Sequence, residues 1–377
     1  MSAGRRRAPA RWGVAGVVLL ALLSGCASDK PKPSPLEQVT PKIAGRLVWS
    51  AKMDGARFPL AVVLRDGNFI VASTNGTLLG LEAQTGRQLW SANAGAALSA
   101  GVGSDGAFHA VVTVDNQLVV FEGTQVVWRE QLKSRVTTPP FVAGERVFVM
   151  GVDRAVQAFD VRDGKRLWTL QRPGDALTLL NIGVLTAVRD TLVAGQGSRL
   201  TGIDPLRGTL RWEVPVGSPR GTNEVERLAD VVGPALRVGN NLCARSFQVA
   251  VGCADAETGR LLWTRNFGGI HAIGGDSETV FGADATDRIA AWKTENGETL
   301  WTNERFLFRG LSAPASVGPT VVFGDFEGYV HFLDRKDGKT LLRLATDGSP
   351  VVGRPVLAGT TLLVVTRNGG LFAFRPE

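Results

Sequence analysis

The sequence predicts an all-β protein, an eight-bladed β-propeller, and three observations support this prediction. A phrase of a glycine turn followed by tryptophan recurs, with closing residues at positions 49, 90, 128, 168, 212, 263, 301 and 342. The interval of about 40 residues is typical of solenoids and propellers. Within each unit, short runs of valine, leucine and phenylalanine alternate with Asp-Gly or Asn-Gly turns, as in the hairpins of a propeller blade. No segment of the mature chain has a sustained helical period.

The recurring phrase has six clear copies, the last of which ends in leucine instead of tryptophan, and two weaker ones. The clear copies are Glu82–Trp90, Asp160–Trp168, Asp204–Trp212, Asp255–Trp263, Lys293–Trp301 and Asp334–Leu342; the weaker ones are Gly45–Trp49 and Glu122–Trp128. We expect each glycine to take a positive φ in the turn between the third and fourth strands. We expect each tryptophan to pack against the neighbouring blade as a structural residue. The aspartates that begin the phrase, Asp204, Asp255 and Asp334 among them, are interpreted as turn caps.

The first 25 residues are predicted to be a lipoprotein signal peptide. Four arginines precede an apolar run, Gly13–Leu23, which is too short to span a bilayer. The following Leu23-Ser24-Gly25-Cys26 resembles the lipobox of bacterial lipoproteins, which implies acylation of Cys26; an ordinary secretory signal with an incidental cysteine is the alternative. The formal net charge is +7, and loss of the four arginines leaves about +3.

The mature chain is predicted to begin with a lipidated tether, residues 26–41, followed by the propeller, residues 42–377. The tether is rich in proline, lysine and serine, which favours an extended segment. After the last repeat the chain supplies only three more strands, so the N-terminal strand Ile43–Trp49 should complete the last blade and close the ring. These three strands are predicted at Val351–Leu357, Thr361–Thr366 and Gly370–Phe374.

The sequence offers no recognisable catalytic, metal or cofactor site. His109, His271 and His331 are isolated in strand-like contexts, and structural roles are the simpler interpretation. No metal-ligand spacing, nucleophile motif or phosphate-binding loop occurs, and no basic stripe suggests nucleic acid. Cys243 and Cys253 lie in a predicted hairpin, where either a disulfide or two free thiols is consistent with export.

The repeats resemble the blades of quinoprotein alcohol dehydrogenases, which makes such an enzyme the main alternative. That family places pyrroloquinoline quinone and calcium on the propeller axis, often beside a vicinal cysteine pair. Here the two cysteines stand at positions 243 and 253, and no Cys-x-x-Cys-His motif is present. A propeller lipoprotein that binds a small ligand is a further alternative.

Two stretches, together with the lipobox and the repeats, are similar to the BamB family, the lipoprotein subunits of the outer-membrane β-barrel assembly machine. They are GTNEVERLADV at Gly221–Val231 and GDFEGYVHFLDRKDGK at Gly324–Lys339. The resemblance covers nearly the whole chain and implies a non-enzymatic scaffold without a cofactor. It also implies lipid anchoring in the outer membrane, facing the periplasm. The implied partners are BamA, other Bam subunits and unfolded barrel precursors.

The longest repeats, which close at Trp212 and Trp263, hold their extra residues in 174–183 and 217–230. Extra residues in a repeat commonly form loops on a binding face. By resemblance, these loops contact a periplasmic domain of BamA through Leu177, Leu179, Glu224, Arg227, Leu228 and Asp230. Strand packing for the leucines, and an internal Arg227–Asp230 pair, are the alternatives. The chain departs from the family pattern at Leu180-Asn181, where the pattern has arginine after its leucines, and at Val232, where the pattern has a second acidic residue.

Overall fold

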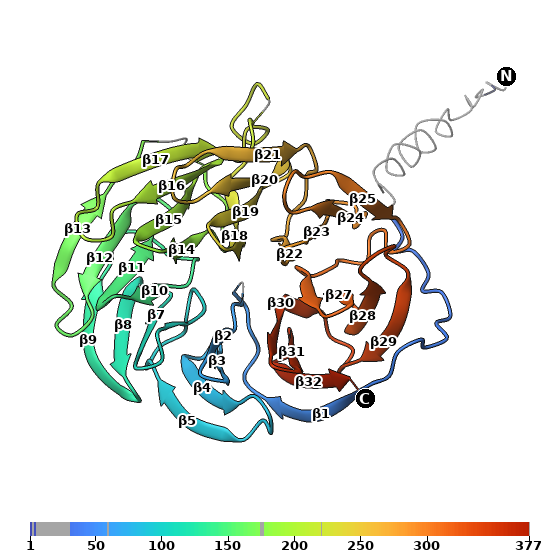
Figure 1. Cartoon of the computed structure of the whole chain (residues 1–377), viewed down its shortest axis with the longest axis horizontal. Helices are drawn as coiled ribbons and strands as arrows, with labels where there is room; N and C mark the ends of the chain where they lie inside the picture. Colours follow the sequence, from blue (N-terminus) through green and yellow to red (C-terminus); the bar gives the residue numbers. More distant parts are fainter. Residues whose placement is uncertain (2–3, 5–30, 59, 174–176, 220, 377) are drawn as a thin grey trace. The chain divides into compact units, whose positions relative to one another are not determined.

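The computed structural model describes residues 1, 4, 31–58, 60–173, 177–219 and 221–376, so Cys26 lies outside the described residues. The chain divides into two units, Met1–Pro33 and Ser34–Glu377. The second unit consists of eight four-stranded antiparallel sheets arranged as blades around one axis (Figure 1), which confirms the predicted eight-bladed propeller. In the part of the chain that the structure describes, no helix has the length and apolarity needed to cross a membrane.

Blades 1 to 4 each contain four consecutive strands. Their bounds are β2 Val63–Arg65, β3 Asn68–Ala72, β4 Thr77–Glu82 and β5 Gln88–Asn93; β6 Gly103–Ser104, β7 Phe108–Val112, β8 Gln117–Glu122 and β9 Gln125–Gln131; β10 Phe141–Ala143, β11 Arg146–Met150, β12 Val156–Asp160 and β13 Arg166–Leu170; β14 Leu185–Val188, β15 Thr191–Gln196, β16 Arg199–Ile203 and β17 Leu210–Pro215.

Blades 5 to 7 repeat this arrangement, and blade 8 combines the two ends of the unit. The bounds are β18 Val231–Val238, β19 Asn241–Ser246, β20 Ala250–Asp255 and β21 Leu261–Arg265; β22 Gly274–Gly275, β23 Thr279–Ala283, β24 Ile289–Lys293 and β25 Thr299–Asn303; β26 Ala315–Val317, β27 Thr320–Gly324, β28 Tyr329–Asp334 and β29 Thr340–Ala345; β30 Val351–Ala358, β31 Thr361–Thr366, β32 Gly370–Pro376 and β1 Gly45–Lys52.

Closure occurs where the sequence predicts it. Strand β1 pairs with β32 in antiparallel register, from Gly45 opposite Pro376 to Lys52 opposite Gly370. The two strands lie side by side at the rim of blade 8 (Figure 1). Because a closed ring leaves no blade without a neighbour, this pairing protects both ends of the array.

Six tryptophans join neighbouring blades in one repeated geometry. Each ring lies against the turn glycine of the next blade, and its indole N–H donates to a backbone carbonyl of that turn, as Trp263 does to the Thr294 oxygen at 2.8 Å. The turn glycine, here Gly297, has a φ of 69°. The six are Trp49, Trp128, Trp168, Trp212, Trp263 and Trp301. These contacts confirm the expected roles of the glycine and the tryptophan.

Two seams depart from this geometry. Trp90 lies against Gly80 of its own blade and stacks on His109 of blade 2, with ring centroids 4.5 Å apart. Blade 2 has a tighter turn between β8 and β9, at Gly123, so the usual docking turn is missing there. Blade 8 has no turn between its last two strands, because β32 and β1 belong to opposite ends of the unit. Leu342 stands at that seam.

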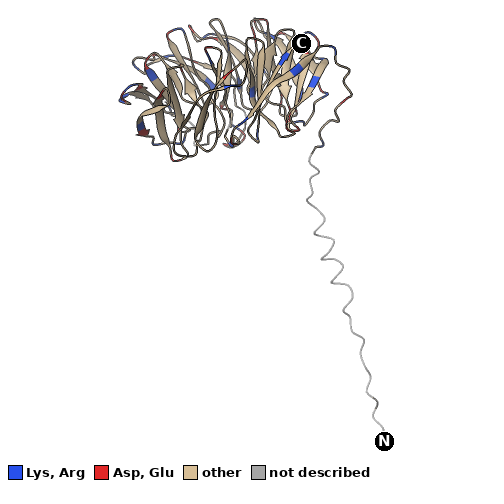
Figure 2. Ribbon diagram, turned by 90° about the horizontal axis from the view of Figure 1, so that it is seen from below, with Lys and Arg blue, Asp and Glu red and all other residues tan. Residues whose placement is uncertain are grey.

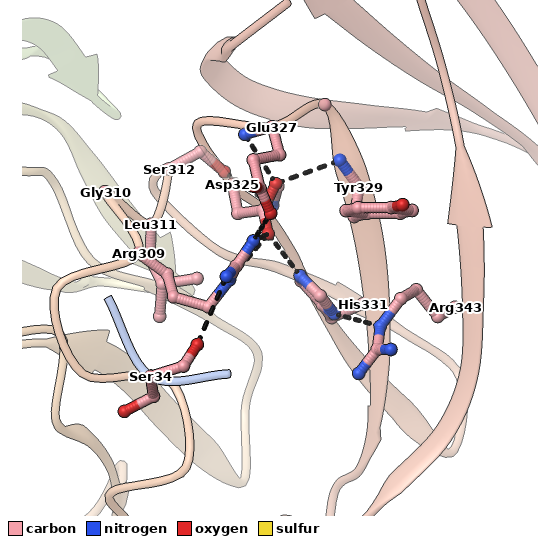
Figure 3. A network of polar contacts seen from close by, with 12 residues as sticks. Ser34, Arg309, Gly310, Leu311, Ser312, Asp325, Glu327, Tyr329, His331 and Arg343 are labelled. Carbon is pink, nitrogen blue, oxygen red and sulfur yellow. Dashed lines mark hydrogen bonds and ion pairs between the residues drawn. The ribbon is translucent and has the colours of Figure 1, made fainter. Parts of the chain in front are cut away.

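Residues 34–42 lie along blade 7 as a strap before β1 begins. Ser34 N–H donates to the Leu307 carbonyl at 2.9 Å, and the Ser34 carbonyl accepts from Arg309 at 3.2 Å. Figure 3 shows that Arg309 also contacts Asp325, which in turn contacts His331. Further along the strap, the Glu37 carboxylate pairs with Arg305 at 3.1 Å. The strap therefore belongs to the same compact unit as the blades.

The apolar core lies within and between the blades. Buried residues of β3, β4, β7 and β31 form one cluster across the blade 8, blade 1 and blade 2 seams, and similar clusters follow around the ring. In the edge view of Figure 2, acidic and basic residues of the ring are scattered rather than gathered into one band. A disulfide joins Cys243 and Cys253, which lie opposite each other on β19 and β20 with Cα atoms 3.9 Å apart.

Candidate partner-docking site

The two long loops of the sequence connect blade 4 to its two neighbours. The first runs from β13 to β14, and within it residues 174–176 lie outside the described residues. The second runs from β17 to β18, and Figure 1 shows it extending beyond the ring above β21. Neither Leu177 nor Leu179 belongs to a strand. The two loops therefore flank one blade, as binding loops on a repeat scaffold commonly do.

Asp230 ties the two loops together. Its carboxylate accepts a hydrogen bond from the Leu179 N–H at 2.8 Å, although 51 positions separate the two residues. The same carboxylate lies 3.6 Å from the guanidinium of Arg154, in the β11–β12 turn of blade 3. Arg154 also donates to the Leu177 carbonyl at 3.4 Å. Both charged side chains are mostly buried, so this ion pair is well placed to order the loops.

Leu179 and Leu177 lie in different environments. Leu179 is half-buried and packs on a small cluster that contains Val232 and Ala272. Leu177 is 38% exposed and Leu180 is 59% exposed. Leu179 therefore holds the first loop against the ring, while Leu177 and Leu180 are exposed to solvent.

The second loop has its own local hydrogen bonds. The Glu226 carboxylate accepts from the Thr222 N–H at 2.8 Å, and the Glu226 N–H donates to the Asn223 side chain at 2.9 Å. The first of these bonds is the main cause that lowers the pKa of Glu226. These contacts turn Val225 outward, where it is 72% exposed. Glu224 and Arg227 are also exposed.

A groove lies between the second loop and blade 5. Its volume is about 440 Å³, and its lining includes Val225, Leu228, Leu261 and Val249. Leu228 is half-buried at this groove. Exposed apolar residues around a groove are typical of a protein-binding surface. Leu180 and Val225 were missed as site residues by the sequence, because exposure within an irregular loop has no period to reveal it.

The remaining candidates for chemistry do not come together. His109 lies in blade 2, His271 in the connection before β22, and His331 in blade 7. Burial lowers the pKa of His109, whose ring nitrogen lies 2.7 Å from the Ser104 hydroxyl. Among the described residues, no group of three His, Cys, Asp or Glu side chains is placed to hold a metal ion.

Comparison with known proteins supplies the context for these loops. The family model described as outer membrane protein assembly factor BamB matches residues 39–98 and 74–303. A relative of that name from Burkholderia pseudomallei is 35% identical over 368 residues, which cover 96% of each chain. Another, from Bordetella pertussis, is 35% identical over 382 residues, which cover 98% of this chain and 99% of the relative.

Solved structures show the same fold at lower identity. The crystal structure of BamB from Moraxella catarrhalis has a TM-score of 0.79 and 22% identity, and the match covers 88% of this chain and 99% of that one. Quinohemoprotein alcohol dehydrogenase from Comamonas testosteroni has a TM-score of 0.67 and 13% identity, with 88% and 76% of the chains covered. At such identities both likenesses concern the architecture alone.

Proposed function

The chain belongs to the BamB family of outer membrane protein assembly factors, and from this premise we propose that it is a non-enzymatic scaffold that docks onto BamA. In this role it would aid the assembly and insertion of β-barrel proteins into the outer membrane. The observation that carries the proposal is the Asp230 contact, which couples two loops and leaves apolar side chains exposed on both. Because the ring supports these loops, docking should cause only a small loss of conformational entropy.

The docking surface consists of the exposed residues Leu177, Leu180 and Val225. Apolar side chains at the centre of an interface supply most of the binding energy, and charged neighbours set the register. Glu224 and Arg227 have that peripheral position on the second loop. Leu179 and Asp230 contribute by ordering the surface, because their described contacts face the ring and the other loop.

The membrane arrangement is a second part of the proposal. Acylation of Cys26 would hold the protein at the outer membrane, and the residues between Cys26 and the strap would link the ring to this anchor. Unfolded barrel precursors, and the other Bam subunits, are further partners in this proposal. Mass spectrometry of the mature N-terminus should show a diacylated or triacylated Cys26.

Co-purification from solubilised envelopes tests the docking surface. The variant Leu177→Ala/Val225→Ala should recover at least about tenfold less BamA than wild type, since two interface anchors are lost. The matched control is Leu206→Ala, a leucine that is 62% exposed on the outer turn of the same blade. Equal recovery of BamA by the double variant and the control would refute the loop assignment.

The variant Asp230→Ala tests whether Asp230 orders the docking loops or contacts BamA directly. It should also weaken BamA recovery, and hydrogen exchange should show faster exchange of the Leu179 amide in the isolated protein.

The dehydrogenase alternative predicts dye-linked alcohol oxidation after addition of pyrroloquinoline quinone and calcium. We expect no such activity, and turnover above a heat-inactivated control would contradict the scaffold role.

A further inference from the structure

An open cavity lies on the axis of the ring, where the connections before the inner strands of several blades converge. Its volume is about 680 Å³. The walls come from blades 1, 4, 5, 6, 7 and 8, and apolar side chains such as Phe58, Ile182, Val232 and Phe326 form much of the lining. Leu180 of the first docking loop stands at this cavity as well. A cavity of this size is within the usual range for small-molecule sites.

The charged lining of the cavity is entirely basic. Arg57, Arg354 and Arg367 line it together with His271, and no aspartate or glutamate is among the described lining residues. Arg57 and Arg367 are exposed, whereas Arg354 is half-buried. Across the described residues, no carboxylate lies within ion-pair distance of these three guanidinium groups. Other arginines of the described surface do have such partners, for example Arg305 and Arg335.

Arg354 is the central group of this cluster. Burial lowers the pKa of its guanidinium, and burial is the sole cause of that shift. No hydrogen bond from the Arg354 side chain to a described residue accompanies this desolvation. Because the Arg354 guanidinium is partly desolvated and has no carboxylate partner, a bound anion would add charge-assisted hydrogen bonds to it.

A buried cation, Arg245, lies near His271 of the cavity lining. Arg245 is fully buried on β19, and its Nε and Nη2 atoms have no hydrogen-bond partner among the described residues. Its Nη1 donates to the Phe267 carbonyl at 3.1 Å. Desolvation by the surrounding protein, and then the charge of Arg245, lower the pKa of His271 to about 4, although part of this side chain is exposed. His271 is therefore neutral near pH 7 and is available as a hydrogen-bonding group, while Arg245 adds to the positive potential.

We propose that the axial cavity binds a small organic anion, with a carboxylate or phosphate group held by Arg354 and an apolar body against the cavity wall. Arg57 and Arg367 at the exposed part of the lining would attract the anion and complete its hydrogen bonds. Guanidinium groups match carboxylate and phosphate geometry through paired N–H donors. The apolar lining favours an organic anion over an inorganic one, because a bare inorganic ion would leave the apolar side chains of the wall in contact with water.

Titration calorimetry on the full chain in a zwitterionic detergent tests this site with phenyl phosphate as the probe. Wild type should bind one equivalent, and binding should weaken as salt increases. Arg354→Gln should raise the Kd about tenfold to a hundredfold, as expected for the loss of charge-assisted hydrogen bonds. Arg207→Gln is the matched control, because it removes the same charge from an exposed turn outside the cavity and should leave the Kd unchanged.

Two further ligands and one further variant complete the test. Benzyl alcohol, which has the ring without the charge, and inorganic phosphate, which has the charge without the ring, should each bind at least about tenfold more weakly than phenyl phosphate. Benzoate should compete with phenyl phosphate, because the proposed site accepts a carboxylate as well as a phosphate. Arg57→Gln/Arg367→Gln should weaken binding even if Arg354→Gln fails to fold.

The opposite results would overturn the proposal. No saturable heat with wild type, or equal affinity in Arg354→Gln and Arg207→Gln, would show that the arginines do not form a site. Equal binding of benzyl alcohol and phenyl phosphate would show an apolar cavity without anion recognition. None of these outcomes depends on BamA docking, so the site and the proposed scaffold role can fail separately.

Discussion

The seam between blades 5 and 6 and the seam between blades 7 and 8 join similar strands in different ways. At the first seam, Trp263 covers Gly297 and its indole N–H donates to the Thr294 carbonyl at 2.8 Å. At the second, Leu342 takes the tryptophan position, and an apolar cavity of about 540 Å³ lies beside it. Both side chains are 6% exposed, so burial alone does not distinguish them.

The difference follows from chain connectivity. A tryptophan at this position needs a glycine turn in the next blade, both as a surface for its ring and as an acceptor for its N–H. Blade 8 has two free ends, β32 and β1, where the other blades have that turn. A tryptophan there would therefore gain no hydrogen bond from a turn of the next blade. Ile43, Phe374 and other residues of both ends line the cavity instead.

The largest expected effect comes from truncating the two seam residues. Trp263→Ala should lower the free energy of unfolding by about 4 kcal/mol, since it removes a large buried ring and leaves a cavity. Leu342→Ala should cost about 2 kcal/mol, at the lower end for leucine, because that site already adjoins a cavity. Urea denaturation followed by tryptophan fluorescence and circular dichroism measures both. Equal losses would mean that the two seams are energetically equivalent.

The second prediction concerns the turn glycine beneath the tryptophan. Gly297→Ala should cost about 3 kcal/mol, because the residue has a positive φ and an added Cβ would lie 2.5 Å from the Trp263 ring. Gly359→Ala is the control in blade 8. It also has a positive φ, but the nearest atom to its added Cβ is 3.8 Å away, so about 1 kcal/mol is expected. Similar costs would show that backbone strain alone explains the glycine.

The third prediction is a gain in stability at the seam between blades 7 and 8. Leu342→Trp should raise the free energy of unfolding by about 1 kcal/mol, because the larger ring would occupy part of the adjoining cavity. The gain should be small, since no turn carbonyl accepts its N–H. Thermal unfolding of this variant beside wild type measures the change. A loss above about 2 kcal/mol, typical of overpacking, would contradict the interpretation of the cavity as spare volume.

The smallest expected effect is a pH dependence of stability in blade 7, next to its seam with blade 8. His331 accepts a hydrogen bond from Arg343 at Nδ1 and contacts Asp325 through Nε2 (Figure 3). Burial lowers the pKa of His331, although Asp325 opposes this. The unfolded chain therefore binds the proton more tightly, and stability should fall as the pH decreases below about 6.5.

Hydrogen exchange at pH 7 and pH 5, corrected for intrinsic rates, measures this effect locally. Amides of β28 and β29 should lose more opening free energy on acidification than those of β21. His331→Asn should remove most of that difference. Asp325 acts in a lower range: burial raises its pKa, but contacts with His331 and Arg309 outweigh this and lower it. Its contribution is present above about pH 3.8 and is lost only as the pH falls further. If the opening free energy fell equally in β21, β28 and β29 on acidification, His331 would not be the cause of a local pH dependence.

The predicted elements and the observed ones agree where the repeat is local. The sequence places the last three strands within a few residues of β30, β31 and β32, and it places the closing strand close to β1. The reversal of the strands, the glycine conformation and the aspartate caps depend on neighbours only a few positions apart, as the Asp255 contacts with the Glu257 and Thr258 amides illustrate. The sequence of each repeat is therefore sufficient to predict these features.

The docking loops and the axial cavity depend on long-range contacts. The sequence located the two loops by their extra length, but it did not show that Asp230 pairs with Arg154 and orders Leu179. Nor did it show that Arg57 and Arg354 meet in one cavity, since they come from the first and last blades.

The sequence by itself therefore determined the number of blades, the closure and the tryptophan seams, because short-range periodicity and turn chemistry specify them. The tertiary structure alone decided which loop residues face outward and which cations lack partners. The physical reason is that exposure and charge neutralisation depend on groups brought together across the ring, and no sequence spacing records those distances.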